Sequence, residues 1–274
     1  MSNNPLSPGQ VSVLADELAR AFEQARPVEP LTGRVPGLDL TGAYAVQDAL
    51  VARWIASGDR VVGHKVGLTS AAMQAQLGVE QPDSGVLLDR MVLSDGAVID
   101  AGRMIAPWVE AEIAFVLGAP VPPTATREQA AAAVASVAVA IEVIDSRITD
   151  WRIGVCDTVA DNASSAYAVL GWPVPAADAG DLPTLGLTLH RQGQLVATGA
   201  GAAVLGDPVL ALIWLARRLA ARGQQLQPGQ IVLPGAVHAS VPIAAGDVVT
   251  ATGAGLGTVT LHAAAHLTEP EGIA

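Results

Sequence analysis

The chain has 274 residues, 51% of them hydrophobic, and its 26 acidic and 15 basic side chains give a formal net charge of −11. This acidity argues against nucleic acid or an anionic membrane as a partner, because both favour clustered lysine and arginine. The single cysteine, Cys156, excludes an intrachain disulfide, which fits a reducing compartment.

No targeting or membrane-spanning segment is predicted. The N-terminus has neither a basic region nor the apolar stretch of a signal peptide. The longest apolar stretch, 130–141, is rich in Ala and too short to span a bilayer. We therefore expect a cytoplasmic protein.

Two amphipathic helices are predicted at the start of the chain. Apolar residues at three- and four-residue spacing predict a helix over 8–26. After a link that contains several Pro and Gly residues, Thr41 is expected to cap a second helix that ends near Gly58. We expect residues 1–58 to form a helical cap that belongs to the same unit as the rest of the chain.

From residue 60 onward, short strands dominate the pattern. Extended segments are expected at 60–67, 85–93, 110–117, 139–144, 185–190, 195–198, 231–233, 248–252 and 258–262, with a hairpin joining the fifth to the sixth. Helices are expected at 70–77, at 126–137 with Thr126 as N-cap, and from Asp207 to a stop at Gly223. Many short strands with few helices predict an α+β catalytic domain over 59–266, built on a strongly curved sheet, and a frayed tail over 267–274.

Two glutamates share one face of the predicted strand 110–117. Successive side chains of a strand alternate between faces, so Glu110 and Glu112 point the same way while their neighbours face the core. Two carboxylates held together repel each other unless a cation or a proton lies between them. The alternative, a half-exposed strand with two ordinary surface acids, is equally compatible with the spacing.

Glu142 interrupts an otherwise apolar strand, where an unpaired carboxylate would be costly to bury. Beside Glu110 and Glu112 it would complete an oxygen-rich site for Mg²⁺ or Mn²⁺. Zinc is less suited, because no His or Cys cluster has ligand spacing. Asp145 and Arg147 are expected to form a structural ion pair.

Of the 15 basic residues, 14 are arginine and one is lysine, Lys65. An ammonium can release its proton whereas a guanidinium effectively cannot, so Lys65 is a candidate for proton transfer, with chance as the alternative. It lies in a Gly-flanked strand end, and Asp83 follows in a Pro-containing turn. Near a metal the two would form a proton-transfer pair. His64 faces away in a regular strand and is interpreted as structural.

The small polar run 159–165 offers another candidate group. Its hydroxyl and amide groups, Ser164 among them, could contact a substrate oxygen. The same residues could equally begin a helix, with Asp161 or Asn162 as N-cap.

Six segments taken in order resemble the 2-keto-4-pentenoate hydratase and 4-oxalocrotonate decarboxylase family, within the fumarylacetoacetate hydrolase superfamily. They are HKVGLTSAAMQAQLGVEQPDSG, PWVEAEIAFVL, AIEVIDSRITDW, DTVADNASS, GAGAAVLGDP and GDVVTATGAGLGTV. The resemblance runs from about residue 43 to residue 259. It implies a mixed β-sheet rolled around the site with an N-terminal helical cap, and a Mg²⁺ or Mn²⁺ ion held by Glu110, Glu112 and Glu142.

The resemblance also implies roles for further residues. Lys65 and Asp83 match the acid–base pair of the family. The implied substrate contacts are Leu68, Ser164, Gly235 and Ala236. Pro234 departs from the family pattern, where Ser, Thr or Gly is more usual, and it supplies neither a hydroxyl nor an N–H group.

The implied reaction is the addition of water to 2-hydroxypenta-2,4-dienoate or a homologue, in the catabolism of aromatic or steroid-type compounds after meta-cleavage. The alternative is 4-oxalocrotonate decarboxylase on the same metal site, because both reactions proceed through one enolate stabilised by one metal. The PDSG segment and the loop 234–242 favour the hydratase. Hydrolysis of an acylpyruvate is disfavoured because no His–Glu pair precedes Glu110, and a non-catalytic subunit is disfavoured because all five expected metal and acid–base residues are present. A homo-oligomer, pentameric or decameric, is implied, with association to a decarboxylase or aldolase of the pathway.

Overall fold

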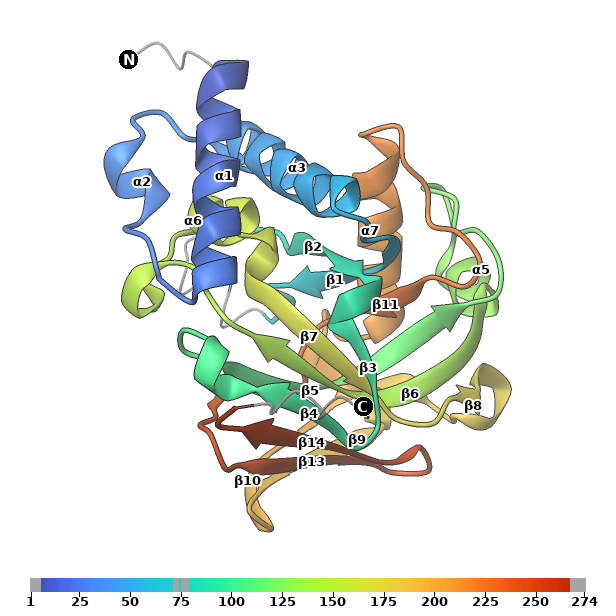
Figure 1. The fold of residues 1–274 in the computed structure, drawn as a ribbon. Coiled ribbons are helices and arrows are strands. Elements are labelled where there is room, and N and C mark those ends of the chain that lie inside the picture. The colour runs from blue at the N-terminus through green and yellow to red at the C-terminus, as the bar shows by residue number, and fades with distance from the viewer. Residues whose placement is uncertain (1–5, 71–73, 75–78, 267–274) are drawn as a thin grey trace, which may run out of the picture.

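The computed structural model describes residues 6–70, 74 and 79–266, which form two β-sheets with helices packed around the larger one (Figure 1). The larger sheet is curled and has the strand order β2-β1-β11-β5-β6-β7-β3, with β12 paired to β5 and β8 to β6. Its strands are β1 (Val61–Gly67), β2 (Asp83–Leu88), β3 (Val92–Ser94), β5 (Trp108–Leu117), β6 (Val134–Ile144), β7 (Ser165–Leu170), β8 (Val174–Pro175), β11 (Ile231–Leu233) and β12 (Val241–Pro242). Contacts between β2 and β7 bring the two ends of the curl together.

The smaller sheet has the order β10-β9-β13-β14-β4 and lies below the larger one in Figure 1. Its strands are β4 (Ala97–Asp100), β9 (Gly186–Arg191), β10 (Gln194–Ala200), β13 (Val248–Gly253) and β14 (Gly257–Ala264). The predicted hairpin is confirmed as β9–β10, and Gln192 and Gly193 both have the positive φ values that a tight two-residue turn requires. Parallel pairs occur in both sheets among antiparallel ones, so the expected α+β fold with a rolled, mixed sheet is confirmed.

The helices are short except for three. In chain order, the described α-helices are α1 (Pro8–Gln24), α2 (Leu31–Arg34), α3 (Leu40–Ala56), α5 (Arg127–Ala132), α6 (Val155–Ala160) and α7 (Pro208–Ala220). The three long ones are α1, α3 and α7. The prediction that Thr41 caps the second helix was wrong. Asp39 has the extended backbone of an N-cap, and its carboxylate accepts a hydrogen bond from the N–H of Gly42. Asp207 and Thr126 are the N-caps of α7 and α5, as expected.

The predicted helix 126–137 is too long. The structure ends α5 at Ala132, and Val134 already pairs with Leu117 as the first residue of β6. The alanine-rich stretch favours a helix locally, but pairing along the whole length of β5 overrides this weak preference. The β-branched residues Val134 and Val137 favour the extended form as well.

Helices α1, α3 and α6 form a layer outside β2 (Figure 1). Leu18, Leu50 and Trp54 are buried in this layer together with Leu88 of β2. The amide of Gln47 on α3 donates to the carbonyls of Ser84 (2.8 Å) and Val159 (2.9 Å), which ties the helical layer to the end of β2. The boundary drawn at residue 58 stays a prediction.

The main core lies between the two sheets and α7. One set of alternate residues of β5, including Ile113 and Phe115, is fully buried there against residues of the smaller sheet such as Leu189 and Leu261. Burying side chains of this size stabilises the fold by roughly 1.5–3 kcal/mol each. The other set of alternate residues on β5 must therefore point to the concave side of the curled sheet.

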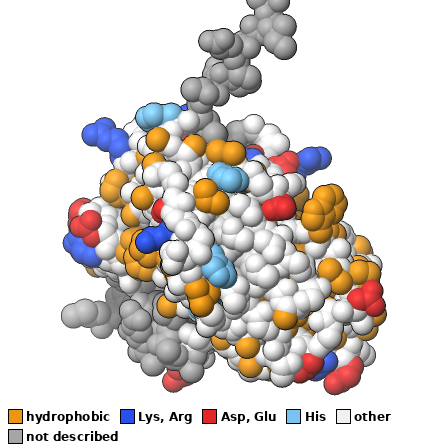
Figure 2. Space-filling model, turned by 90° about the horizontal axis from the view of Figure 1, so that it is seen from below, with side chains coloured by type: hydrophobic (Ala, Val, Ile, Leu, Met, Phe, Trp, Pro, Cys, Tyr) orange, Lys and Arg blue, Asp and Glu red, His pale blue; other side chains and the backbone are white. Residues whose placement is uncertain are grey.

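The outer face of the smaller sheet carries few charges (Figure 2). Residues that alternate with its buried positions are partly exposed threonines and histidines, namely Thr188, His190, Thr250, Thr252, Thr260 and His262. Neighbouring hydroxyls pair across strands, as between Thr252 and Thr258 (3.0 Å). This charge-poor face is notable in a chain with a net charge of −11.

Two predictions lie largely outside the described residues. They are the helix over 70–77 and the frayed tail over 267–274. Among the residues that the structure does describe, no helix is both long enough and apolar enough to cross a membrane.

His64 on β1 makes the stability depend on pH. Burial lowers the pKa of its imidazole to about 4, and the nearby Arg222 adds to this effect. Because the unfolded chain binds the proton near pH 6.5, the folded state is favoured above that pH and loses this contribution as the pH falls toward 4.

We expect His64→Gln to remove this dependence. The free energy of unfolding of the parent protein relative to the variant should fall by up to about 3 kcal/mol between pH 7 and pH 4. Urea titrations at several pH values measure the difference, with the exposed His266 changed to Gln as the control. A difference that does not change with pH would contradict this assignment.

Candidate active site

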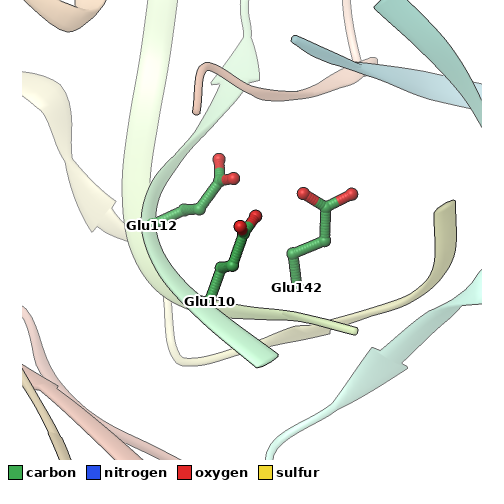
Figure 3. Close-up of side chains that lie close together, drawn as sticks. All are labelled: Glu110, Glu112 and Glu142. Atoms are coloured by element: carbon green, nitrogen blue, oxygen red, sulfur yellow. The ribbon is translucent and has the colours of Figure 1, made fainter. Parts of the chain in front are cut away.

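Three glutamate side chains converge on the concave side of the curled sheet (Figure 3). Glu110 and Glu112 lie on β5, and Glu142 lies on β6 directly opposite Glu110. One carboxylate oxygen of each lies within 4.8 Å of the others. The predicted common face of Glu110 and Glu112 is therefore confirmed, and Glu142 joins it as expected.

The surroundings of this cluster leave its negative charge poorly compensated. Glu112 and Glu142 are completely buried, and one oxygen of Glu112 and both of Glu142 have no hydrogen-bond partner among the described residues. Burial raises the pKa of Glu110 to about 7, and the facing Glu142 contributes to the rise. Burial also raises the pKa of Glu112 and of Glu142. Like charges opposite each other in a sheet are destabilising, so the cluster is stabilised by binding protons or a further cation.

The donor set fits a hard divalent cation. The cluster offers three carboxylates, and oxygens of Glu112 and Glu142 lack hydrogen bonds among the described residues. Carboxylate oxygens are the ligands that Mg²⁺ and Mn²⁺ prefer. Glu110 is the partly exposed member of the three, so solvent approaches the cluster from its side.

Lys65 is the cation next to the cluster. Its Nζ lies 3.4 Å from a carboxylate oxygen of Glu142 and donates a hydrogen bond to the carbonyl of Ala163 (3.2 Å). Burial by itself would lower the pKa of the Lys65 ammonium, but the carboxylates of Glu142 and Asp83 outweigh that effect and raise it. The lone lysine is thus placed in the site, as the sequence suggested.

Asp83 lies on the same face as Lys65, one strand away. On the β1–β2 ladder Lys65 is opposite Gly85, and Asp83 is opposite Gly67, so each charged residue faces a glycine. A Cβ atom on Gly67 would lie 2.2 Å from Oδ1 of Asp83. The absence of a side chain there leaves room for the carboxylate. Burial raises the pKa of Asp83, and Lys65 opposes the rise.

Small apolar side chains form the floor beneath these charges. A separate buried cluster on the concave side consists of Leu87, Ala114, Ala140, Ala168 and Leu233. They lie on the same face as the site residues, and all but Leu87 are two positions away from one along a strand or opposite one on a neighbouring strand. The site is therefore a polar layer on an apolar layer inside the curl.

Of the four expected substrate contacts, Gly235 is hydrogen-bonded to a glutamate of the cluster among the described residues. Ser164 is buried in the segment that follows Ala163, and Leu68 comes just after β1 with a positive φ of 55°. The N–H of Gly235 donates to Glu112 (2.8 Å). Ala236 is half-buried in the loop that follows.

Gly235 requires its glycine. Its φ is 129°, and a Cβ atom there would lie 2.1 Å from Oγ1 of the buried Thr69. This close approach lets the loop beside Pro234 reach Glu112 with a backbone N–H group. Thr69 was not singled out from the sequence, because only the folded loop brings it to Gly235.

The expected ion pair between Asp145 and Arg147 was wrong. The guanidinium of Arg147 pairs with the carboxylate of Asp161, while the carboxylate of Asp145 accepts hydrogen bonds from the N–H groups of Ile105 (2.9 Å) and Ala106 (2.7 Å). The guanidinium points toward Asp161 and Ser165, at the start of β7, rather than along its own strand. Asp161 therefore does not act as a helix N-cap.

Comparison with known proteins gives concordant matches. The model of the family "Fumarylacetoacetate (FAA) hydrolase C-terminal" matches residues 60–262. A 2-keto-4-pentenoate hydratase of Paraburkholderia xenovorans is 42% identical over 256 residues, covering 93% of this chain and 95% of that protein. The TodF product hydratase of Pseudomonas putida is 44% identical over 92% of this chain and 94% of its own.

Decarboxylases match as well. A 4-oxalocrotonate decarboxylase of Pseudomonas putida is 39% identical over 94% of this chain and 98% of its own. The solved structure of the 4-oxalocrotonate decarboxylase from Pseudomonas putida G7, complexed with magnesium and adipate, superposes with a TM-score of 0.91 at 38% identity. It covers 94% of this chain and 99% of that one.

We expect Glu110→Gln to change the stability of the metal-free protein in a pH-dependent way. A glutamate with a raised pKa contributes stability below about pH 4.5 that is lost as the pH rises to about 7. Between these values the metal-free parent should lose on the order of 2 kcal/mol relative to the variant. Urea unfolding in the presence of EDTA measures this difference.

Added Mg²⁺ should make the parent protein more stable than the Glu110→Gln variant. At a hundredfold excess over its Kd it should stabilise the parent by about 2.7 kcal/mol but the variant much less. The exposed Glu23 on α1, changed to Gln, is the matched control. Equal stabilisation of Glu110→Gln and the parent by Mg²⁺ would contradict a metal site at this cluster.

Proposed function

The chain belongs to the fumarylacetoacetate hydrolase family, and within it we propose that the protein is a divalent-metal-dependent hydratase. Its substrate would be 2-hydroxypenta-2,4-dienoate or a longer homologue, and its product a 4-hydroxy-2-oxoalkanoate. The observation that carries the proposal is the juxtaposition of the unpaired glutamate oxygens with Lys65 and Asp83. The similarity to several hydratases at 42–44% identity supports this choice of reaction.

Glu110, Glu112 and Glu142 would hold the ion, which we propose to be Mg²⁺ or Mn²⁺. When bound, such an ion supplies Lewis-acid stabilisation of the negative charge that develops on the C2 oxygen of the substrate. The N–H of Gly235 and the ammonium of Lys65 orient two of the carboxylates toward the centre of the cluster.

The reaction requires two proton transfers and one addition of water. The dienol first loses its hydroxyl proton at O2 and gains a proton at C5, which yields the 2-oxo-3-enoate. Water then adds across the C3–C4 double bond, with its oxygen on C4 and a proton on C3. The sum is one substrate and one water giving one 4-hydroxy-2-oxopentanoate.

We propose that Lys65 and Asp83 move these protons. Both lie at the edge of the glutamate cluster, both are buried, and the ladder places them on one face. Burial keeps water from competing for the proton and strengthens their mutual interaction. General acid–base catalysis of this kind typically contributes a factor of about 10²–10⁴ in rate.

We further propose Leu68, Ser164, Gly235 and Ala236 as substrate contacts. Ser164 directly follows the residue whose carbonyl binds Lys65, and Gly235 is hydrogen-bonded to Glu112. Leu68 comes three residues after Lys65 along the chain. Ala236 follows Gly235, so each of the four lies on a segment that supplies a site residue or is hydrogen-bonded to one.

Decarboxylation of 4-oxalocrotonate is the second candidate. It is favoured by the 39% identity to a decarboxylase and by the close superposition with the G7 enzyme. The same oxo group would accept the electrons released when a distal carboxylate leaves as CO₂. The glutamate cluster would serve both reactions, so they are distinguished by which of the two substrates the protein turns over.

The proposal also includes the cellular setting. We propose a cytoplasmic homo-oligomer, pentameric or decameric, that acts in aromatic or steroid-type catabolism after meta-cleavage. Association with a decarboxylase or aldolase of the same pathway would pass unstable enol intermediates from one enzyme to the next. Size-exclusion chromatography with light scattering measures the oligomer.

The two reactions can be separated by one pair of assays. With Mg²⁺ present, we expect loss of 2-hydroxypenta-2,4-dienoate and formation of 4-hydroxy-2-oxopentanoate. Incubation with 2-oxo-3-hexenedioate should release little CO₂. Rapid CO₂ release from the diacid without turnover of the dienoate would establish the decarboxylase instead.

We expect Lys65→Arg to reduce kcat by at least about 100-fold, because a guanidinium keeps its proton. The variant should remain folded and should still bind Mn²⁺, since the glutamates are unchanged. Steady-state kinetics and Mn²⁺ titration measure both quantities. Near-normal turnover would show that the ammonium is not required.

A further inference from the structure

A buried arginine lies behind the proposed acid–base lysine. Arg147 follows β6 and is completely buried. Its guanidinium donates to the carboxylate and the carbonyl of Asp161, and through Nη1 it donates to the carbonyls of Ser165 (2.9 Å) and Asp145 (3.0 Å). One side chain therefore joins the residue before the segment 162–164 to the residue after it.

The segment between these two anchor points has an unusual backbone. Asn162, Ala163 and Ser164 have φ values of 51°, 51° and 54°, so three consecutive L-residues adopt the left-handed conformation. Each such residue costs roughly 1–2 kcal/mol, and none of the three is a glycine. A run of this kind persists only where its surroundings impose it.

A second contact holds the segment on its other side. The Asn162 amide accepts a hydrogen bond from the N–H of Val86 (2.8 Å) and donates one to its carbonyl (2.9 Å). The amide thus pairs with β2 in the way a further strand residue would. The carbonyl of Ser164 also accepts from the N–H of Asp145 (2.9 Å). The segment is therefore hydrogen-bonded to β2 and to Asp145, and Arg147 binds the residues on either side of it.

The left-handed backbone directs the carbonyl of Ala163 at Lys65. This carbonyl accepts a hydrogen bond from Nζ (3.2 Å), while Glu142 lies 3.4 Å from the same atom. A lysine side chain has four rotatable bonds, so a single ion pair leaves its ammonium considerable freedom. The second contact from the other side restricts that freedom.

We infer that Arg147 and Asn162 are positioning residues for Lys65. They hold the segment 162–164 in its left-handed form, and the carbonyl of Ala163 then fixes the ammonium beside Glu142 and Asp83. The inference rests on the proposed role of Lys65 in proton transfer. Neither Arg147 nor Asn162 is a ligand candidate for the metal, so the glutamates should retain their affinity for it when either is replaced.

The main test is Arg147→Lys. An ammonium keeps the positive charge beside Asp161, but it lacks the planar fork whose separate nitrogens reach Asp161 and Ser165 together, so the two ends of the segment are no longer joined. We expect kcat for the dienoate to fall 10- to 100-fold, with KM and the Kd for Mn²⁺ unchanged within about threefold. A displacement of about 1 Å at a reacting group is enough for a loss of this size.

The matched control is Arg152→Lys, which alters an exposed ion pair with Glu29. It should leave kcat, KM and Mn²⁺ binding unchanged. The Mn²⁺ stoichiometry counts folded sites, so kcat is expressed per site. A purely structural role for Arg147 would reduce the number of sites without changing kcat per site, and that result would overturn the inference.

If Arg147→Lys does not fold, Asn162→Gly answers the same question. Glycine adopts the left-handed region freely, so only the two bonds to Val86 are lost. A several-fold fall in kcat per Mn²⁺ site at constant KM would support the inference, and an unchanged kcat would overturn it.

The Lys65→Arg variant distinguishes a failure of the proposed role of Lys65 from a failure of the positioning role of Arg147. If that variant keeps its activity, the proposed role of Lys65 fails and the positioning role fails with it. If Lys65→Arg loses activity while folded Arg147→Lys keeps it, only the positioning role fails.

Discussion

Repulsion among buried carboxylates is the constraint on which this structure depends. Glu110, Glu112 and Glu142 have oxygens within 4.8 Å of one another, and Asp83 lies on the same concave face. Lys65 is a single positive charge among these four acids. Such a cluster is stable only with protons or a cation present, so its raised pKa values and its suitability for a divalent ion have the same physical origin.

The curled sheet makes this concentration of charge tolerable by separating its two faces. The convex face of β5 and β6 is apolar and packs against the smaller sheet, so the main core is separate from the charged interior. On the concave face, glycines stand opposite Lys65 and Asp83, and alanines such as Ala114 and Ala140 lie beneath the glutamates. Small residues thus provide the space in which large charged ones can approach one another.

The parts of the site that follow from strand periodicity could be predicted, and the parts that follow from irregular backbone could not. A period of two is sufficient to place Glu110 and Glu112 on one face. The end of the helix predicted over 126–137 depended on the pairing of β6 with β5, which the alanine-rich sequence does not reveal. The partner of Arg147 depended on a left-handed turn that contains no glycine, so nothing local indicated that Asp161 would be brought to it.

The central place of β11 affects how the protein reaches this structure. β11 contributes only three residues, yet it separates β1 from β5, pairing with Gly63–Lys65 on one side and with Phe115 and Val116 on the other. Lys65 and the glutamates therefore cannot take up their places until β11, whose residues lie 168 positions after their partners on β1, has been inserted between them. Contacts this distant in sequence slow folding, since the entropy of closing the loop must be overcome first. During synthesis, the site can form only after the chain has left the ribosome as far as β11.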